Sequence, residues 1–188
     1  VIEGSSVPER GRPVGPVVPV RRERSAARVL QRWARSILRI LVRRLDVTGV
    51  ERIPMDRPAI LAANHTNALA DVAVIVAVAP RFPRFLASAT WWRHAPARAL
   101  FALGGAVPVH RRRDGDASRN SEMFSACTDA LRAGDHIAIF PEGEMHQGSE
   151  LLPLRTGAAR IALGAAAGGV RDAVIVPLGL DRKSTRLN

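Results

Sequence analysis

Residues 59–71 read AILAANHTNALAD, an apolar run followed directly by polar side chains. The run AILAA follows Pro58 and has a length typical of a buried strand, which predicts a strand over 59–63. A second apolar run predicts a helix over 68–79. The polar residues between these two elements therefore lie at the carboxyl end of a strand, which is where open α/β sheets bind ligands.

The alternation of strands and helices continues along the chain. Further strands are predicted over 85–87, 106–109, 136–140 and 174–178, and further helices over 91–103, 119–132 and 156–167. This order indicates an α/β fold with a largely parallel central sheet flanked by helices. We expect residues 46–181 to form that domain, because 188 residues suit one domain rather than two.

The N-terminal residues follow a different pattern. Residues 1–22 are rich in Pro, Gly, Val and Arg and are predicted to form a flexible arm. Residues 23–45 are predicted to form a basic amphipathic helix, because apolar residues and arginines each recur every three or four positions. The apolar stripe contains Leu30, Trp33, Ile37, Leu41 and Leu45, and the basic stripe contains Arg28, Arg32, Arg35, Arg39 and Arg43. Such a helix fits an anionic lipid interface, and the alternative is a helix packed on the domain with a solvated basic face.

Both ends of the sequence are unusual. The first residue is Val1 rather than methionine, and residues 182–188 contain Lys183, the only lysine of the chain. This tail resembles translated adapter sequence, so we interpret it as artefactual and expect the domain to be truncated at its C-terminus.

The overall charge indicates an anionic partner. The net charge is +11 and the pI is about 11.6, which suits nucleic acid, an acidic membrane surface or a phosphorylated substrate. Nucleic acid is the least favoured of these, because aromatic residues make up only 4% of the chain and no nucleic-acid-binding motif is present. Cys127 is the only cysteine, which excludes a disulfide within the chain.

Two polar clusters at predicted strand ends are candidates for chemistry. His65 follows strand 59–63 and suits a general base, and Asp71 lies where it could orient the imidazole and stabilise its protonated form. The structural alternative is a histidine that caps a strand–helix turn. The run from Phe140 to Gly143 (FPEG) follows strand 136–140 and projects Glu142 at a strand end. Glu142 could bind substrate hydroxyls or stabilise the turn by accepting backbone N–H bonds.

Two arginines are candidates for phosphate binding. Arg111 follows strand 106–109, where a guanidinium can bind phosphate through two hydrogen bonds, although a solvated charge run is the alternative. Arg155 precedes helix 156–167, at an N-terminus that favours anions.

The order and spacing of these residues resemble the glycerolipid acyltransferase family, which includes glycerol-3-phosphate and lysophosphatidate acyltransferases. Four motif blocks are matched in order: Asn64, His65 and Asp71; Gly105 and Arg111; Phe140 to Gly143 with Arg155 and Gly157; and Val176 with Pro177. The resemblance covers roughly residues 45–181.

The resemblance implies a reaction and its participants. His65 would deprotonate the acceptor hydroxyl, which would attack the thioester of acyl-CoA or acyl-carrier protein, and Asp71 would orient His65. The residues implied to bind substrate are Asn64, Arg111, Glu142, Gly143 and Arg155. Of these, Arg111 and Arg155 would bind the phosphate of the acceptor, which is a glycerol phosphate or lysophosphatidate. No cofactor and no metal is expected, since a thioester is already activated. The other implied partner is a membrane lipid surface, not nucleic acid, with the protein peripheral or monotopic at the cytoplasmic face.

Two positions depart from the family pattern. Five residues separate His65 from Asp71 where the family usually has four, which would turn Asp71 by about 100° on a helix unless the loop absorbs the change. Met145 stands where the family often has an arginine, which removes one phosphate contact. The alternatives are an inactive or truncated membrane-binding relative and a basic nucleic-acid-binding protein. A serine hydrolase is disfavoured, because no Gly-x-Ser-x-Gly sequence is present.

Overall fold

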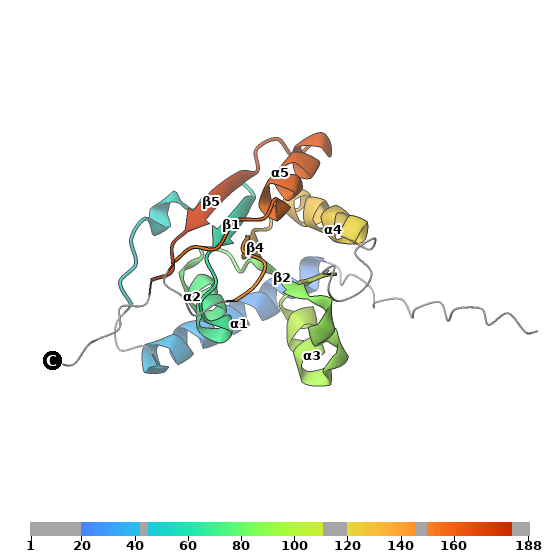
Figure 1. Cartoon of the computed structure of the whole chain (residues 1–188). Coiled ribbons are helices and arrows are strands. Elements are labelled where there is room, and N and C mark those ends of the chain that lie inside the picture. The colour runs from blue at the N-terminus through green and yellow to red at the C-terminus, as the bar shows by residue number, and fades with distance from the viewer. Residues whose placement is uncertain (1–19, 42–44, 111–119, 146–149, 182–188) are drawn as a thin grey trace, which may run out of the picture.

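The central sheet is parallel. The structure, a computed structural model, describes residues 20–41, 45–110, 120–145 and 150–181 (Figure 1). The strands are β1 (Ala59–Ala63), β2 (Arg84–Ser88), β3 (Val107–Val109), β4 (Ile137–Ile139) and β5 (Val174–Leu178). They lie in the order β3-β2-β4-β1-β5, and the neighbours pair in parallel. The predicted fold is confirmed, and β1 and β5 have the predicted bounds.

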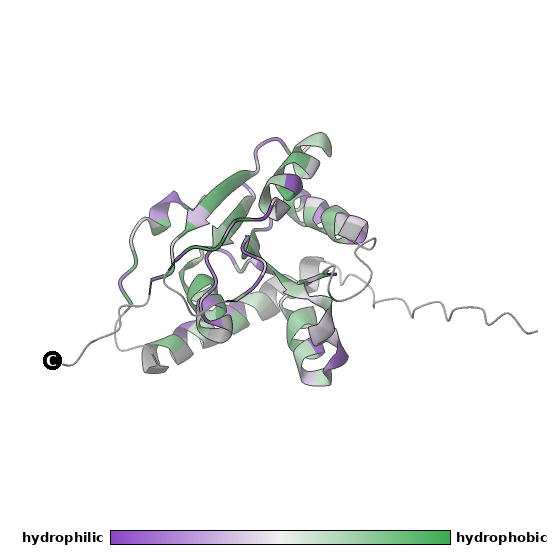
Figure 2. Ribbon diagram, viewed as in Figure 1, coloured by the Kyte–Doolittle hydropathy of each residue, from purple (hydrophilic) through white to green (hydrophobic). Residues whose placement is uncertain are grey.

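Helices cover both faces of the sheet (Figure 1). The described helices are α1 (Val20–Leu41), α2 (Ala68–Val78), α3 (Ala95–Leu103), α4 (Asn120–Arg132) and α5 (Gly157–Ala167), with short 3-10 helices η1 (Val50–Arg52) and η2 (Ala89–Arg93). Of these, α2 packs on one face of the sheet, and α4 and α5 pack on the other. Successive side chains of a strand point to opposite faces, so Ile60 packs among residues of α4 and α5 whereas Leu61 packs among residues of α2. The strands are apolar along most of their length (Figure 2), as expected for a sheet buried on both faces.

The register of the strands brings the polar clusters together. In the sheet, β1 lies between β4 and β5, with Ala62 opposite both Ile139 and Pro177. The residues after β1 and the FPEG turn after β4 therefore emerge next to each other at one edge.

The single helix predicted over 91–103 is wrong. The structure has the separate elements η2 and α3, which meet at His94. The reason is Pro96, which lacks the N–H that a continuous helix would bond to the carbonyl of Trp92 and is tolerated only in a first turn.

The N-terminal helix begins earlier than predicted. It starts at Val20, so residues 20–22 are helical rather than part of an arm. It ends at Leu41 rather than at residue 45, because Leu45 is not helical and residues 42–44 lie outside the described residues. The rest of the predicted arm, residues 1–19, and the 182–188 tail also lie outside them. Trp33 of the predicted apolar stripe is 65% exposed. The helix packs on the domain through a different face, in which Gln31 and Leu38 are buried.

Buried Gln31 completes the C-terminus of α2. Its Nε2 donates to the carbonyl oxygens of Val76 and Ala79, at 3.0 and 2.6 Å, and Arg35 Nε donates to that of Ala77 at 2.8 Å. The last carbonyls of a helix lack partners within that helix, so side chains of α1 supply the donors that the last carbonyls of α2 need.

None of the helices in the described ranges is long and apolar enough to cross a membrane.

Candidate active site

His65 and Asp71 form a hydrogen-bonded pair between β1 and α2. His65 Nδ1 lies 3.1 Å from Asp71 Oδ2, and the same oxygen accepts the backbone N–H groups of Thr66 and Asn67, at 2.8 and 2.6 Å. Asp71 is 4% exposed. A carboxylate at Nδ1 holds the proton there, so Nε2 is the nitrogen with a free lone pair. The pair therefore has the geometry of a general base with its orienting carboxylate.

The loop absorbs the additional residue between His65 and Asp71. Asp71 lies in the first turn of α2, and Asn67 caps that helix by accepting the N–H of Ala70 at 3.2 Å. The N–H groups of the loop converge on the carboxylate, which brings His65 within hydrogen-bonding distance despite the longer spacing.

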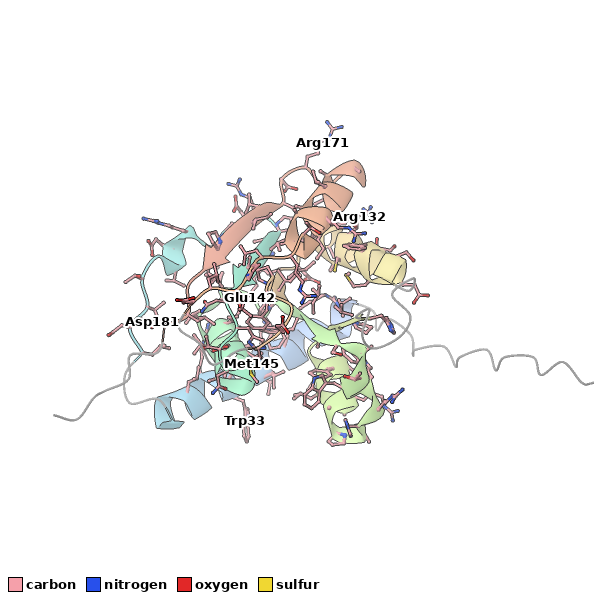
Figure 3. The ribbon with its side chains drawn as sticks, viewed as in Figure 1. Trp33, Arg132, Glu142, Met145, Arg171 and Asp181 are labelled. Atoms are coloured by element: carbon pink, nitrogen blue, oxygen red, sulfur yellow. The ribbon has the colours of Figure 1, made fainter. Side chains whose placement is uncertain are left out.

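The FPEG turn packs directly against His65. The ring of Phe140 stacks on the imidazole, with centroids 3.8 Å apart and planes 15° from parallel. Glu142 Oε1 accepts the backbone N–H of His65 at 3.3 Å, and Glu142 is 1% exposed, in the interior of the molecule (Figure 3). The sequence assigned no role to Phe140. The alternation of side chains could have indicated its position. Phe140 follows β4 directly and points to the same face as Ala138, which packs against α2.

Arg155 holds the FPEG turn from outside. Its backbone N–H donates to Pro141 O at 2.8 Å, its Nε donates to Glu142 O at 3.0 Å, and its Nη2 lies 3.4 Å from Glu144 Oε1. The side chain remains 65% exposed. Its predicted role in phosphate binding stays a prediction, and the guanidinium lies beside the turn that carries Glu142.

Gly143 has no room for a side chain. Its φ is +74°, and a Cβ atom would lie 2.7 Å from Arg155 Nε. We expect Gly143→Ala to destabilise the fold by about 2 kcal/mol, roughly half from the left-handed backbone and the rest from displacing Arg155. Thermal unfolding measures this loss. The control is Gly169→Ala, where φ is +92° but nothing lies within 4 Å of the added atom, so only the backbone cost remains. Equal losses at the two glycines would contradict the clash.

The other predicted site residues have different positions. Asn64 uses both ends of its amide on the backbone of Leu180, donating to the carbonyl at 2.9 Å and accepting the N–H at 2.7 Å. This ties the ends of β1 and β5 together, and its role in substrate binding stays a prediction. Arg111 lies outside the described residues. The described ranges contain no group of three or more His, Cys, Asp or Glu side chains that could hold a metal ion.

His136 is buried at the opposite end of β4. Burial is the main cause that lowers the pKa of its imidazole, and the positive charge of Arg81 lowers it further. The backbone of Arg57 and Pro54 and the negative charge of Asp135 raise the pKa, but by less in total. The unfolded chain therefore takes up a proton near pH 6.5 that the folded chain does not. We expect the free energy of unfolding to fall by up to about 1.4 kcal/mol per pH unit below that value.

The measurement is the Tm of the parent chain and of His136→Gln between pH 7.5 and 5.5. The parent Tm is expected to fall more steeply, because the variant has no imidazole to titrate. Parallel pH profiles would show that His136 is not responsible.

The family of the chain follows from its comparison with known proteins. A family model described as acyltransferase matches residues 44–181. The chain belongs to this acyltransferase family. The match includes His65, Asp71 and the FPEG turn, and it confirms the resemblance to glycerolipid acyltransferases.

Relatives of this acyltransferase-family chain are known from several organisms. Human 1-acyl-sn-glycerol-3-phosphate acyltransferase alpha is 25% identical over 120 residues, which are 64% of this chain and 41% of the human protein. Glycerol-3-phosphate O-acyltransferase 2 of Saccharomyces cerevisiae is 42% identical over 62 residues, 32% of this chain and 8% of the yeast protein. The chain spans about two fifths of the length of the first of these relatives.

A solved structure shows the same fold. The crystal structure of PlsC from Thermotoga maritima, a 1-acyl-sn-glycerophosphate (LPA) acyltransferase, superposes with a TM-score of 0.62 at 18% identity, covering 88% of this chain and 72% of PlsC. The family fold therefore extends over most of the described residues.

Proposed function

We propose that the chain transfers a fatty acyl group from acyl-CoA or acyl-carrier protein to the hydroxyl of a glycerol phosphate or lysophosphatidate in phospholipid biosynthesis. The observation that carries the proposal is the His65–Asp71 pair, held beside Glu142 at the carboxyl edge of the sheet. The names of the human and yeast relatives support both acceptor classes.

The geometry supports a direct transfer. His65 Nε2 takes the proton of the acceptor hydroxyl as its oxygen attacks the thioester carbonyl, and Asp71 stabilises the imidazolium. When the tetrahedral intermediate collapses, the carbon–sulfur bond breaks and the thiolate leaves with the proton held by His65. The acceptor phosphate would lie against the exposed part of Arg155, with Arg111 as a second cation.

Acyl transfer by the purified chain tests the proposal. Each donor, palmitoyl-CoA and palmitoyl-acyl-carrier protein, is combined with each acceptor, glycerol-3-phosphate and lysophosphatidate, on phospholipid vesicles. We expect one pairing to give product well above the rate of thioester hydrolysis. Absence of product from all four pairings, with the chain shown to be folded, would favour the inactive alternative.

We further infer that α1 binds the cytoplasmic face of a membrane, with the protein peripheral or monotopic. Its outward side exposes Trp33 and Val29 with Arg28 and Arg32, an amphipathic combination that suits the interface of an anionic bilayer. Trp33 projects from α1 away from the sheet (Figure 3). Acyl acceptors with long chains reside in such a bilayer, so this position would place the site near its substrate.

A further inference from the structure

A second element also projects from the domain. Residues 89–103 are here called the η2–α3 hairpin. The structure describes every residue of this segment, and none of its side chains is buried. Figure 1 shows α3 extending from the sheet rather than lying across it. A helical segment that leaves several large apolar side chains exposed offers them as a surface for another partner.

The hairpin has an inner contact and an outer apolar surface. Trp92 and Phe101 pack on each other with ring centroids 4.8 Å apart, which closes η2 onto α3. Trp91, Leu100 and Leu103 are instead 54%, 51% and 46% exposed. Leu100 and Leu103 are three residues apart and share one side of α3.

The positive charge of the hairpin indicates that its partner is anionic. Its sequence, ATWWRHAPARALFAL, contains Arg93 and Arg98, both exposed, and no Asp or Glu. An exposed tryptophan with leucines and arginines is the composition of segments that enter the interface of an anionic bilayer. A protein partner would require a complementary acidic surface, whereas an anionic bilayer supplies the negative charge and the apolar layer together.

The hairpin lies next to α1. The two helices α1 and α3 are in contact, and both lie on the lower side of Figure 1, whereas α5 lies at the top. Arg171 also projects at the top, on the side away from Trp33 (Figure 3). The exposed tryptophans of α1 and of the hairpin thus come from neighbouring elements.

We propose that the η2–α3 hairpin is a second lipid-docking element, which inserts Trp91, Leu100 and Leu103 into the interface of an anionic bilayer while Arg93 and Arg98 bind its headgroups. The proposal rests on the membrane setting of the proposed function. It does not rest on the acyl transfer itself, because lipid binding is measured without acyl donor or acceptor.

The first experiment is cosedimentation of the full chain with vesicles of equal parts phosphatidylglycerol and phosphatidylcholine, and with vesicles of phosphatidylcholine alone. Trp91→Ala combined with Leu100→Ser is expected to lower the partition constant on both vesicle types, by about tenfold or more on the anionic one. Arg93→Gln and Arg98→Gln are each expected to lower it about fivefold on the anionic vesicles only.

Matched controls come from the far side of the molecule. Leu163 of α5 is 71% exposed, and Arg171 is exposed near the start of β5. Leu163→Ser and Arg171→Gln are expected to bind vesicles as the parent does. Equal losses in the control and hairpin variants would overturn the proposal, because binding would then depend only on total charge and hydrophobicity.

A second experiment reports on the position of Trp91 directly. The chain has three tryptophans, so Trp33→Phe with Trp92→Phe leaves Trp91 as the only one. Brominated lipid is expected to quench its fluorescence when vesicles are added. An unquenched Trp91 on vesicle-bound protein would overturn the proposal. So would self-association in sedimentation velocity that Trp91→Ala abolishes without changing vesicle binding, since that result would assign the hairpin to a second copy of the chain.

Discussion

Replacing His65 by alanine is expected to lower kcat for acyl transfer by about 10³- to 10⁴-fold. The variant has no group at the position of Nε2 to take the hydroxyl proton, while Glu142 and Arg155 keep their places because their contacts involve the His65 backbone and the turn. KM for the phosphate-bearing acceptor should change little for the same reason. Initial rates at saturating donor and acceptor measure the effect.

Two controls separate lost chemistry from lost structure. The variant loses the stack on Phe140, so its stability should fall by only about 1 kcal/mol in thermal unfolding. Added imidazole should restore part of the rate by entering the space beside Phe140. A folded His65→Ala enzyme with the parent rate would remove His65 from the mechanism.

Asp71→Asn is expected to lower kcat by about 10²- to 10³-fold. The amide oxygen can still accept hydrogen bonds from Thr66, Asn67 and Nδ1, but a neutral group stabilises the imidazolium far less than a carboxylate does. A free energy of unfolding lower by about 1–3 kcal/mol should accompany the change, because the side chain is buried among charge-assisted hydrogen bonds.

Asp129→Asn is the matched control for this variant. Asp129 is 66% exposed and pairs with Arg132 within one turn of α4, so its charge should matter little for either rate or stability. The comparison is made on kcat and on the free energy of unfolding of each variant. If the two variants had the same kcat, Asp71 would have no role in supporting the base.

The sheet could be predicted because its signals are local. β1 and β5 are short apolar runs, and proline or glycine residues lie near their ends, so pattern alone gave their bounds. The division between η2 and α3 was also present in the sequence, since Pro96 is tolerated in the first turn of a helix but not further inside it. A helical pattern on both sides of the proline concealed it.

The packing of α1 could not be predicted because it depends on distant residues. Gln31 is a polar residue on the buried face, and its partners at Val76 and Ala79 lie 45 and 48 residues further along the chain. Periodicity favours apolar side chains for a buried face, so it selected Trp33 instead. Likewise, the contacts of Arg155 with Pro141 and Glu142 depend on the tertiary path of the chain rather than on spacing.

The convergence of three donors on Asp71 Oδ2 has an evolutionary consequence. Since N–H groups of the loop hold the carboxylate beside His65, we expect that one residue gained or lost between His65 and Asp71 leaves the hydrogen bond between them in place. Insertions and deletions should therefore accumulate at this point of the family more readily than within the FPEG turn, where Gly143 and Arg155 leave no slack. Lineages could thus diverge in the length of this segment without passing through an inactive ancestor.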